Sequence, residues 1–346
     1  MAEKKAVNKV VEPTNEEIDA HVDQLVAKAQ VALSKFEEFT QEQVDYIVAK
    51  CSVAGLDAHG TLAEAAVNET GRGVFEDKAV KNLFACEYVT SNLRHLKTVG
   101  IINEDPLLGI TEIAEPVGVV CGIVPTTNPT STVIFKSLIC LKTRNPIIFS
   151  FHPSAHACSV MAAVVIRDAA IAAGAPEDCI QWLDLKSMYA TTALMKHPGV
   201  ATILATGGNA MVAAAYSCGK PALGVGAGNV PAYVEKTCVL PRAVNDIVLS
   251  KSFDNGMICA SEQAAIVDTE IYDAFMKEIK RFKVYFVNKE EKAKLETFMF
   301  GAVAYSDNVN AAKLNPNVVG KPATWIAEQA GFKVPEDTQI ICAECK

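Results

Sequence analysis

The chain has 346 residues, of which 50% are apolar, and its formal net charge is −8. This acidic balance argues against a nucleic acid partner, because phosphate binding depends on clustered Lys and Arg. Charged residues at 21% exclude a disordered chain, and the apolar content exceeds what one compact core usually holds, so we expect two lobes. The longest apolar runs, Val117–Val124 and Ala157–Ile166, fall short of the roughly 18–20 residues of a membrane-spanning helix. The polar N-terminus has no secretory pattern, so we expect a cytoplasmic protein without a membrane partner.

Helical periodicity dominates the first hundred residues. Glu16–Phe39 carries an apolar stripe at helical spacing, and Gln41–Val53 is similar. Thr14 or Asn15, followed by Glu17, predicts the start of the first helix. We interpret these helices as packing elements.

From residue 111 onward, short β-rich runs alternate with helical segments. Strands are predicted at Val117–Val124, Pro146–Phe151, Cys179–Leu183, Ala201–Thr206, Ala222–Val225, Pro231–Glu235 and Ala264–Asp268. Helices are predicted near Ser131–Leu141, Ala155–Ala173, Tyr189–Lys196, Asn209–Ser217, Pro241–Ser252 and Ile271–Phe282. This alternation predicts an α/β fold with a parallel sheet covered on both faces. Ligands of such sheets lie at the carboxyl ends of the strands.

A boundary between two domains is predicted near Glu235–Arg242, because a strand ends there and a long helical run follows. We divide the chain into residues 1–238, with the N-terminal helices and the cofactor sheet, and residues 239–346. The last stretch, Gly301–Lys346, is rich in Asn and Pro, and we expect it to be irregular.

A rigid polar turn follows the strand that ends at Val124. Two prolines bracket Thr126, Thr127 and Asn128, all of which can form hydrogen bonds. Such a loop can stabilise a developing oxyanion, or it can simply cap the next helix.

Two further strand ends lead into helices. The turn after Phe151 contains His152, Pro153 and Ser154, and the amides at the following helix start favour anions such as nucleotide phosphates. His152 can equally be a structural histidine. The other turn contains Thr206, Gly207 and Gly208, whose glycines let a ligand approach the backbone; it is not a full GxGxxG motif.

A glycine-rich segment and a cysteine loop complete the pattern. Gly224, Gly226 and Gly228 permit close approach of a ligand or of another strand. Further on, an Asp-Asn-Gly turn leads to Cys259 and a polar run. The eleven cysteines are odd in number and scattered, so we expect reduced thiols that are mostly buried, with one reactive candidate. Cys259 is that candidate, and a buried structural cysteine is the alternative.

Together these five segments resemble the aldehyde dehydrogenase superfamily in order and spacing, from about residue 14 to the end. The strings PTTNPTS, LATGGNAM, GVGAGNVP and FDNGMICASEQ are similar to the aldehyde dehydrogenase half of the bifunctional aldehyde–alcohol dehydrogenases. The resemblance implies a Rossmann-like parallel-sheet cofactor domain and a second, incomplete α/β catalytic domain. It also implies a CoA-acylating enzyme of ethanol fermentation, which reversibly converts acetaldehyde, CoA and NAD to acetyl-CoA and NADH.

The resemblance assigns roles to individual residues. Cys259 matches the catalytic cysteine, which attacks the aldehyde to give a thiohemiacetal and, after hydride transfer to NAD, a thioester. The oxyanion is expected at the Cys259 backbone N–H and the preceding polar turn. Family members have Asn where this chain has Thr127, with Asn128 one position further, so either side chain can face the oxygen. The implied cofactor-binding residues are Thr126, His152, Pro153, Ser154, Thr206, Gly207, Gly208, Val225 and Gly226.

Val225 is the most informative departure from the family pattern. Hydrolytic members carry a glutamate at this place, at the same offset from the cysteine, which activates water against the thioester. A valine cannot act as a base. A free thiol such as CoA is a better nucleophile and needs less help, so we expect transfer of the acyl group to CoA.

Family members continue past this point with a Glu-Lys-Leu-Ser-Pro segment at the cofactor site and with an oligomerising strand. The bifunctional relatives then add an iron-dependent alcohol dehydrogenase. We therefore expect the chain to be a truncated form with weak or no turnover. The full-length relatives form filaments, so we also expect self-association.

Three alternatives remain. A non-acylating aldehyde dehydrogenase would form acid without CoA, and an inactive assembly module would keep contacts but no catalysis. A metal-binding protein would rest on Cys342 and Cys345, which supply two ligands where structural zinc takes four, so we expect no metal. NADP stays an alternative to NAD.

Overall fold

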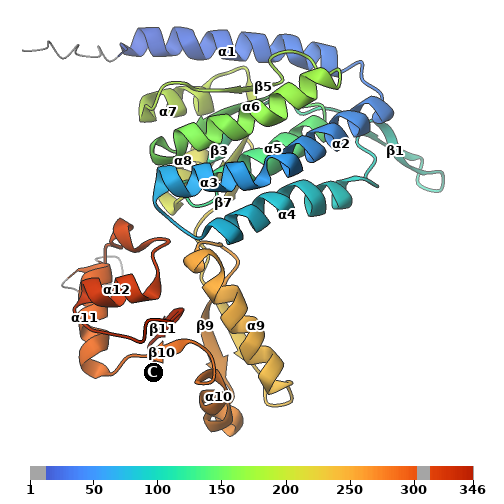
Figure 1. The fold of residues 1–346 in the computed structure, drawn as a ribbon. Coiled ribbons are helices and arrows are strands. Elements are labelled where there is room, and N and C mark those ends of the chain that lie inside the picture. The colour runs from blue at the N-terminus through green and yellow to red at the C-terminus, as the bar shows by residue number, and fades with distance from the viewer. Residues whose placement is uncertain (1–12, 302–311, 346) are drawn as a thin grey trace, which may run out of the picture.

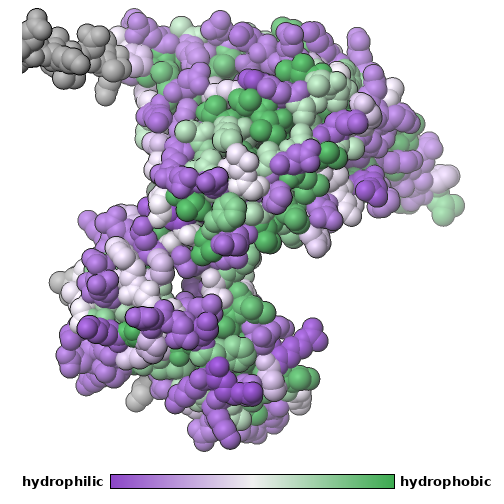
Figure 2. All heavy atoms as spheres, in the orientation of Figure 1, coloured by the Kyte–Doolittle hydropathy of each residue, from purple (hydrophilic) through white to green (hydrophobic). Residues whose placement is uncertain are grey.

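The computed structural model describes residues 13–301 and 312–345. The described chain forms two parts that meet at a narrow junction (Figure 1), which is also visible as a waist on the surface in Figure 2. The larger part contains the N-terminal helices and a five-stranded sheet, and the smaller part contains the C-terminal helices with two pairs of parallel strands.

Four helices lead the chain: α1 (Asn15–Phe36), α2 (Gln41–Asp57), α3 (His59–Thr70) and α4 (Phe75–Leu93). A capping box begins α1, because Thr14 accepts the backbone N–H of Glu17 and the Glu17 side chain accepts the backbone N–H of Thr14. The predicted helix start is therefore confirmed. The apolar periodicity did not predict α4, because its buried face includes Lys78, Lys81 and Asn82.

Five parallel strands form the central sheet in the order β5-β4-β3-β6-β7. They are β3 (Val119–Val124), β4 (Ile147–Phe151), β5 (Ile180–Trp182), β6 (Val200–Thr206) and β7 (Ala222–Val225). The helices between them are α5 (Pro129–Lys142), α6 (His156–Ala172), α7 (Met188–Lys196) and α8 (Asn209–Tyr216). Each of these elements overlaps a predicted segment, so the predicted α/β fold with a Rossmann-like parallel sheet is confirmed.

Alternate side chains of β3 enter two different cores. Val120 and Val124 join the core formed with α2, α5 and α6, whereas Cys121 and Ile123 join the core formed with α1 and α7. β3 and β4 are buried along their whole length, as central strands of a doubly covered parallel sheet should be. The carboxyl ends of the strands are therefore the part of the sheet that remains open to a ligand.

A two-stranded antiparallel hairpin extends from the larger part (Figure 1, right). It consists of β1 (Gly100–Asp105) and β2 (Ile110–Ala114). The Asp105 carboxylate accepts the backbone N–H groups of Leu107 and Leu108 at the tip, at 2.9 and 3.0 Å. The sequence did not predict this hairpin, because most of its residues are exposed and it carries no alternating burial pattern.

The smaller part is built on parallel strands β8 (Val230–Val234) and β9 (Glu262–Val267) and on the shorter pair β10 (Val284–Phe286) and β11 (Ile340–Cys342). Its helices are α9 (Leu240–Ser252), α10 (Tyr272–Ile279), α11 (Lys289–Phe300) and α12 (Ala323–Ala330). The core between them is small, with Val234, Val244, Val248, Phe275 and Ile279.

This topology bears on two predictions from the sequence. The expectation of an irregular stretch from residue 301 is wrong for α12 and β11, which are short elements held by contacts with α11 and β10. β8 pairs within the smaller part, ahead of the predicted division at residues 238/239. That division stays a prediction.

One helical segment, Pro153–Ala172, is long and apolar enough by length and composition to cross a membrane. In this fold its α6 portion packs against α2, α3 and α5, and its apolar residues join the core of the sheet. It therefore serves as a core helix.

Lys136 is a buried cation beneath the carboxyl ends of β3 and β6. Its Nζ donates to the carbonyls of Ile123 and Leu204 at 2.6 and 2.7 Å. Burial lowers the pKa of Lys136 to about 7, below its ordinary value of 10.5. Between these two values the unfolded chain holds a proton that the folded chain releases, so this lysine makes folding more favourable as the pH rises.

Replacing Lys136→Met should remove that pH dependence. Between about pH 7 and about pH 9.5, the free energy of unfolding of the parent should rise relative to the variant by on the order of 2–3 kcal/mol. Urea denaturation of both proteins at the two pH values measures the difference. Parallel pH profiles of parent and variant would show that Lys136 stays charged throughout.

Candidate active site

A cavity of about 1050 Å³ lies at the carboxyl ends of the central strands. The turns that follow β3, β4, β6 and β7 line it, together with the loop after α9 and residues near α11 and α12. The structure brings eleven of the twelve candidate residues to this cavity: Thr126, Thr127, Asn128, His152, Pro153, Thr206, Gly207, Gly208, Val225, Gly226 and Cys259. The twelfth, Ser154, is exposed and does not line the cavity.

Cys259 is the only cysteine lining this cavity among the described residues, and it is exposed. Six other cysteines are buried, and burial raises the pKa of each to about 12: Cys51, Cys86, Cys121, Cys140, Cys158 and Cys179. Such thiols stay protonated and shielded from a substrate. Cys259 is therefore the thiol that can reach a ligand in the cavity.

The three glycines in and directly after β7 allow close approach of other parts of this chain. A Cβ at Gly224 would lie 2.6 Å from Val212, and a Cβ at Gly226 would lie 2.6 Å from Asn209 Oδ1, both on α8. A Cβ at Gly228 would lie 2.7 Å from the backbone oxygen of Cys259. Gly228 is therefore what lets the cysteine loop lie against the end of the sheet.

We expect Gly228→Ala to displace the cysteine loop. The backbone oxygen of Cys259 is not a flexible side-chain end, so the loop must shift, and the alkylation rate of Cys259 by iodoacetamide should change several-fold. The free energy of unfolding should fall by about 1–3 kcal/mol. Gly60→Ala, at a helical position with open space around it, serves as the control. Equal alkylation rates in the two variants would show that the loop tolerates the added carbon.

Two lysines of α4 donate hydrogen bonds to the polar turn after β3. Lys81 Nζ donates to Asn128 Oδ1 at 2.6 Å, and Lys78 Nζ donates to the backbone oxygen of Thr127 at 3.0 Å. The Asn128 amide nitrogen lies 3.3 Å from Thr127 Oγ1 and donates to it. No periodicity in the sequence marks these contacts, because each lysine lies more than forty residues from its partner in the turn.

Hydrogen bonds link the turns after β3 and β4. Thr126 Oγ1 lies 3.0 Å from Ser154 Oγ, and His152 Nδ1 lies 2.8 Å from the same oxygen. Burial, and to a lesser extent the charge of Arg72, lowers the pKa of His152. A neutral imidazole accepts the backbone N–H of Ser154 at 3.2 Å. Ser154 therefore braces Thr126 and His152 while it stays off the cavity surface.

The start of α6 differs from the sequence expectation of free amides. Glu69, on α3, accepts the backbone N–H groups of Ala157 and Cys158 at 2.9 and 2.7 Å. A carboxylate of the protein thus occupies the place expected for a phosphate, and the expectation for this helix is wrong. The start of α8 has no side-chain cap, and a Cβ at Gly208 would meet nothing within 4 Å. The second turn is therefore the open one for an anion.

Lysines supply the charge of the cavity. Lys186, Lys251 and Lys321 line it, and no Asp or Glu does among the described residues. Lys251 Nζ donates to Gln263 Oε1 at 2.7 Å, and burial lowers the pKa of this lysine. None of these three lysines is predicted from the sequence, since they lie in loops or at a helix end without a motif. A cavity with this charge suits ligands that carry phosphates.

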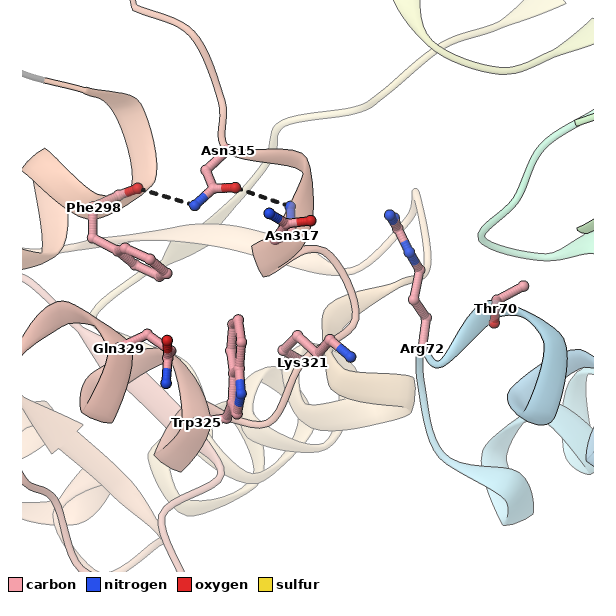
Figure 3. Close-up of a pocket in the computed structure, with 8 residues that line it drawn as sticks. All are labelled: Thr70, Arg72, Phe298, Asn315, Asn317, Lys321, Trp325 and Gln329. Carbon is pink, nitrogen blue, oxygen red and sulfur yellow. Dashed lines mark hydrogen bonds between the residues drawn. The ribbon is translucent and has the colours of Figure 1, made fainter. Parts of the chain in front are cut away.

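A second, smaller pocket of about 340 Å³ lies beside the junction of the two parts (Figure 3). Arg72 and Trp325 line it with side chains around α11 and α12. Asn315 closes one wall by donating to the backbone oxygen of Phe298 at 3.4 Å and accepting the N–H of Asn317 at 3.1 Å. None of the candidate residues lines this pocket.

Within the described part of the chain, no group of three His, Cys, Asp or Glu residues could hold a metal ion. Cys342 is partly buried in β11 and Cys345 is exposed. The pair therefore has no third or fourth ligand of these types among the described residues.

The profile of the aldehyde dehydrogenase family matches residues 3–312. Aldehyde-alcohol dehydrogenase 2 of Entamoeba histolytica is 70% identical over 331 residues, which are 95% of this chain and 38% of that protein. Aldehyde-alcohol dehydrogenase of Streptococcus pneumoniae is 69% identical over 348 residues and is covered to 39%. The chain thus spans somewhat over a third of the length of these curated relatives.

Solved structures agree with this assignment. An acetylating aldehyde dehydrogenase from Geobacillus thermoglucosidasius is 44% identical, with a TM-score of 0.90 over 97% of this chain and 72% of that one. A propionaldehyde dehydrogenase from Rhodopseudomonas palustris, solved with bound CoA and an acylated cysteine, is 30% identical with a TM-score of 0.81 over 94% of this chain and 72% of that one. The chain belongs to the aldehyde dehydrogenase family.

Proposed function

We propose that this chain carries the CoA-acylating aldehyde dehydrogenase site, which converts acetaldehyde, CoA and NAD reversibly to acetyl-CoA and NADH. The observation that supports this most is the composition of the cavity: it presents a cysteine thiol and no carboxylate among the described residues. A thiol can take up an acyl group, and no carboxylate is at hand to activate water for its removal.

Cys259 acts as the nucleophile in this proposal. Its thiolate forms a carbon–sulfur bond to the aldehyde carbonyl, and the negative charge moves to the oxygen. The Asn128 amide or the Thr127 hydroxyl, with the Cys259 backbone N–H, stabilises that charge by hydrogen bonding. A bound NAD would supply the hydride acceptor for the former aldehyde carbon, and the group left on Cys259 is then a thioester.

The thiolate of CoA then attacks the thioester carbonyl. The bond between the acyl carbon and Cys259 breaks, and the thiolate of Cys259 leaves with the bonding electron pair. Val225 lines the cavity, at the place that the family resemblance assigns to the glutamate base of hydrolytic members. An apolar side chain there leaves water without help.

The cavity suits a dinucleotide in size and charge. Its volume of about 1050 Å³ slightly exceeds the roughly 300–1,000 Å³ of most small-molecule and cofactor sites, so it has room for a dinucleotide. Open space at Gly208 and the uncapped start of α8 offer backbone amides to a pyrophosphate. The cavity is also lined by Thr206 and by Thr126 and His152, which are both hydrogen-bonded to Ser154.

Two neighbours in structure support the ligands proposed. The propionaldehyde dehydrogenase of Rhodopseudomonas palustris is described with bound CoA and with propionyl-CoA. An engineered glycolyl-CoA reductase is described with bound NADP⁺, which supports a nicotinamide dinucleotide as the cofactor. For this chain we propose NAD and not NADP as that dinucleotide.

Product analysis with and without CoA tests the proposal. Acetaldehyde and NAD should give acetyl-CoA and NADH only when CoA is present, and NADP should support less turnover. Acetate formation at the same rate without CoA would instead identify a hydrolytic enzyme.

Self-association is a separate proposal about partners. Val80, Phe84 and Tyr88 form an exposed apolar stripe along α4, and the hairpin tip exposes Leu107 and Leu108. Apolar surface of this kind favours contact with another chain. Mass photometry should reveal species larger than the monomer, and a purely monomeric protein would count against it.

With eleven free cysteines, we place the protein in the reducing cytoplasm.

A further inference from the structure

A buried charge cluster joins α4 to the loop that carries Cys259. Lys78 and Lys81 are 3% and 9% exposed, and both pair with one oxygen of Asp254, which is fully buried. The Nζ–Oδ2 distances are 3.1 and 2.5 Å. Burying a charge costs free energy unless the charge is paired. Packing of α4 alone would not favour two buried lysines, so their shared carboxylate indicates a further role.

Asp254 is the anchor of the cysteine loop. Its backbone has a φ of 51°, in the left-handed region that non-glycine residues seldom adopt. The conformation is held on both sides, because the carboxylate accepts the backbone N–H of Val74 and the Asp254 N–H donates to Asp77, both at 2.7 Å. A carboxylate with two lysine partners therefore fixes the start of the turn that leads to Cys259.

Lys81 has three acceptors around its Nζ: Asp254 Oδ2, the backbone oxygen of Met257 at 3.0 Å, and Asn128 Oδ1 at 2.6 Å. Three acceptors match the three N–H groups of an ammonium. Burial lowers the pKa of Lys81, and the carboxylate of Asp254 opposes that shift.

The contact with Asn128 determines how its carboxamide is turned. An ammonium group only donates, so the Asn128 atom that faces Lys81 must be the oxygen. The amide nitrogen is then directed away from Lys81, toward Thr127 Oγ1, on the turn that lines the cavity. A donor aimed in advance is what oxyanion stabilisation requires.

We propose that Lys81 is a positioning residue, which turns the NH₂ group of Asn128 toward the reacting oxygen and holds the Cys259 loop at the matching place. This inference rests on the proposed function and deepens it: of Thr127 and Asn128, it assigns the oxyanion donor to Asn128. Lys78 holds only the backbone oxygen of Thr127 and the shared carboxylate.

The readout is transfer of an acetyl group from acetyl-CoA to Cys259, followed by rapid quenching and intact-protein mass spectrometry. Lys81→Met should lower the rate constant at saturating acetyl-CoA by about 10²-fold and leave the half-saturating concentration unchanged. Lys78→Met is the matched control, since it removes a similarly buried lysine from the same carboxylate, and its effect should stay below about 10-fold. Thermal unfolding of both variants shows the loss of stability that they share.

A double-mutant cycle separates positioning from structure. In an Asn128→Ala background, Lys81→Met should have little further effect on the rate, because the group that Lys81 turns is gone. Asn128→Asp is the second variant: it keeps an acceptor for Lys81 but has no NH₂ group, so it should lose about as much activity as Asn128→Ala while remaining folded.

Multiplying effects of Lys81→Met and Asn128→Ala, equal rates for Lys81→Met and Lys78→Met, or full activity of Asn128→Asp would each overturn the inference while the proposed function stands. A parent chain that takes no acetyl group on Cys259 would overturn the proposed function and this inference with it.

Discussion

Replacing Cys259→Ser should lower aldehyde-dependent NADH formation and acetyl transfer from acetyl-CoA by at least about 10³-fold. A cysteine thiol ionises to a nucleophilic thiolate far more readily than a serine hydroxyl that has no adjacent base. The cavity lining offers no carboxylate base among its described residues, so serine should gain no activation there. The overall fold should persist, because Cys259 is exposed and packs into no core.

Cys345→Ser is the matched control for this variant, because Cys345 is the other exposed cysteine and lies at the far end of the described chain. It should retain the parent's rate. Acetyl transfer would then depend on the cavity cysteine and not on exposed thiols in general. Retention of acetyl transfer by Cys259→Ser would remove the nucleophile from the proposal.

The second large effect concerns Val225. We expect Val225→Glu to raise acetate formation in the absence of CoA by about 10–10²-fold, because the new carboxylate can take a proton from water that attacks the acyl group on Cys259. Val225 is 51% exposed, lies at the end of β7 and lines the cavity, so a glutamate can be accommodated there without disturbing the core.

Val225→Gln is the control for this change, since glutamine has a similar shape but cannot act as a base. It should leave acetate formation near the level of the parent. Acetate measured by an enzyme-coupled assay in CoA-free buffer distinguishes the two variants. Equal acetate yields from the glutamate and glutamine variants would show that the lack of a base at this place does not decide between water and CoA.

The sequence predicted the parts of the molecule in which local pattern and tertiary structure agree. The strands of the central sheet carry uninterrupted apolar runs because both faces are covered, and β3 is buried along its length. The turns that follow these strands lie at the same edge of the sheet because the strands are parallel. Thr127 and Val225 therefore meet at one cavity although they lie far apart in the chain, and the loop after α9 brings Cys259 to the same cavity.

The rest could not be predicted because it depends on partners that are distant in sequence. Lys81 pairs with Asp254 across 173 residues, and Glu69 reaches Cys158 across 89. No periodicity or motif marks such pairs, and a lysine on the buried face of α4 even obscures the helix that carries it. The sequence pattern predicted phosphate binding at the start of α6, where Glu69 instead accepts the backbone N–H groups. It did not predict the lysines that give the cavity its charge.

In the proposed reaction, Cys259 holds an acyl group and CoA removes it. Incubation of the purified chain with acetyl-CoA, followed by proteolysis and mass spectrometry, tests this most directly. We predict a single acetyl group on the peptide that contains Cys259, which disappears when excess free CoA is added and persists in buffer alone. Acetylation of a different cysteine, or loss of the group to buffer as fast as to CoA, would contradict the account.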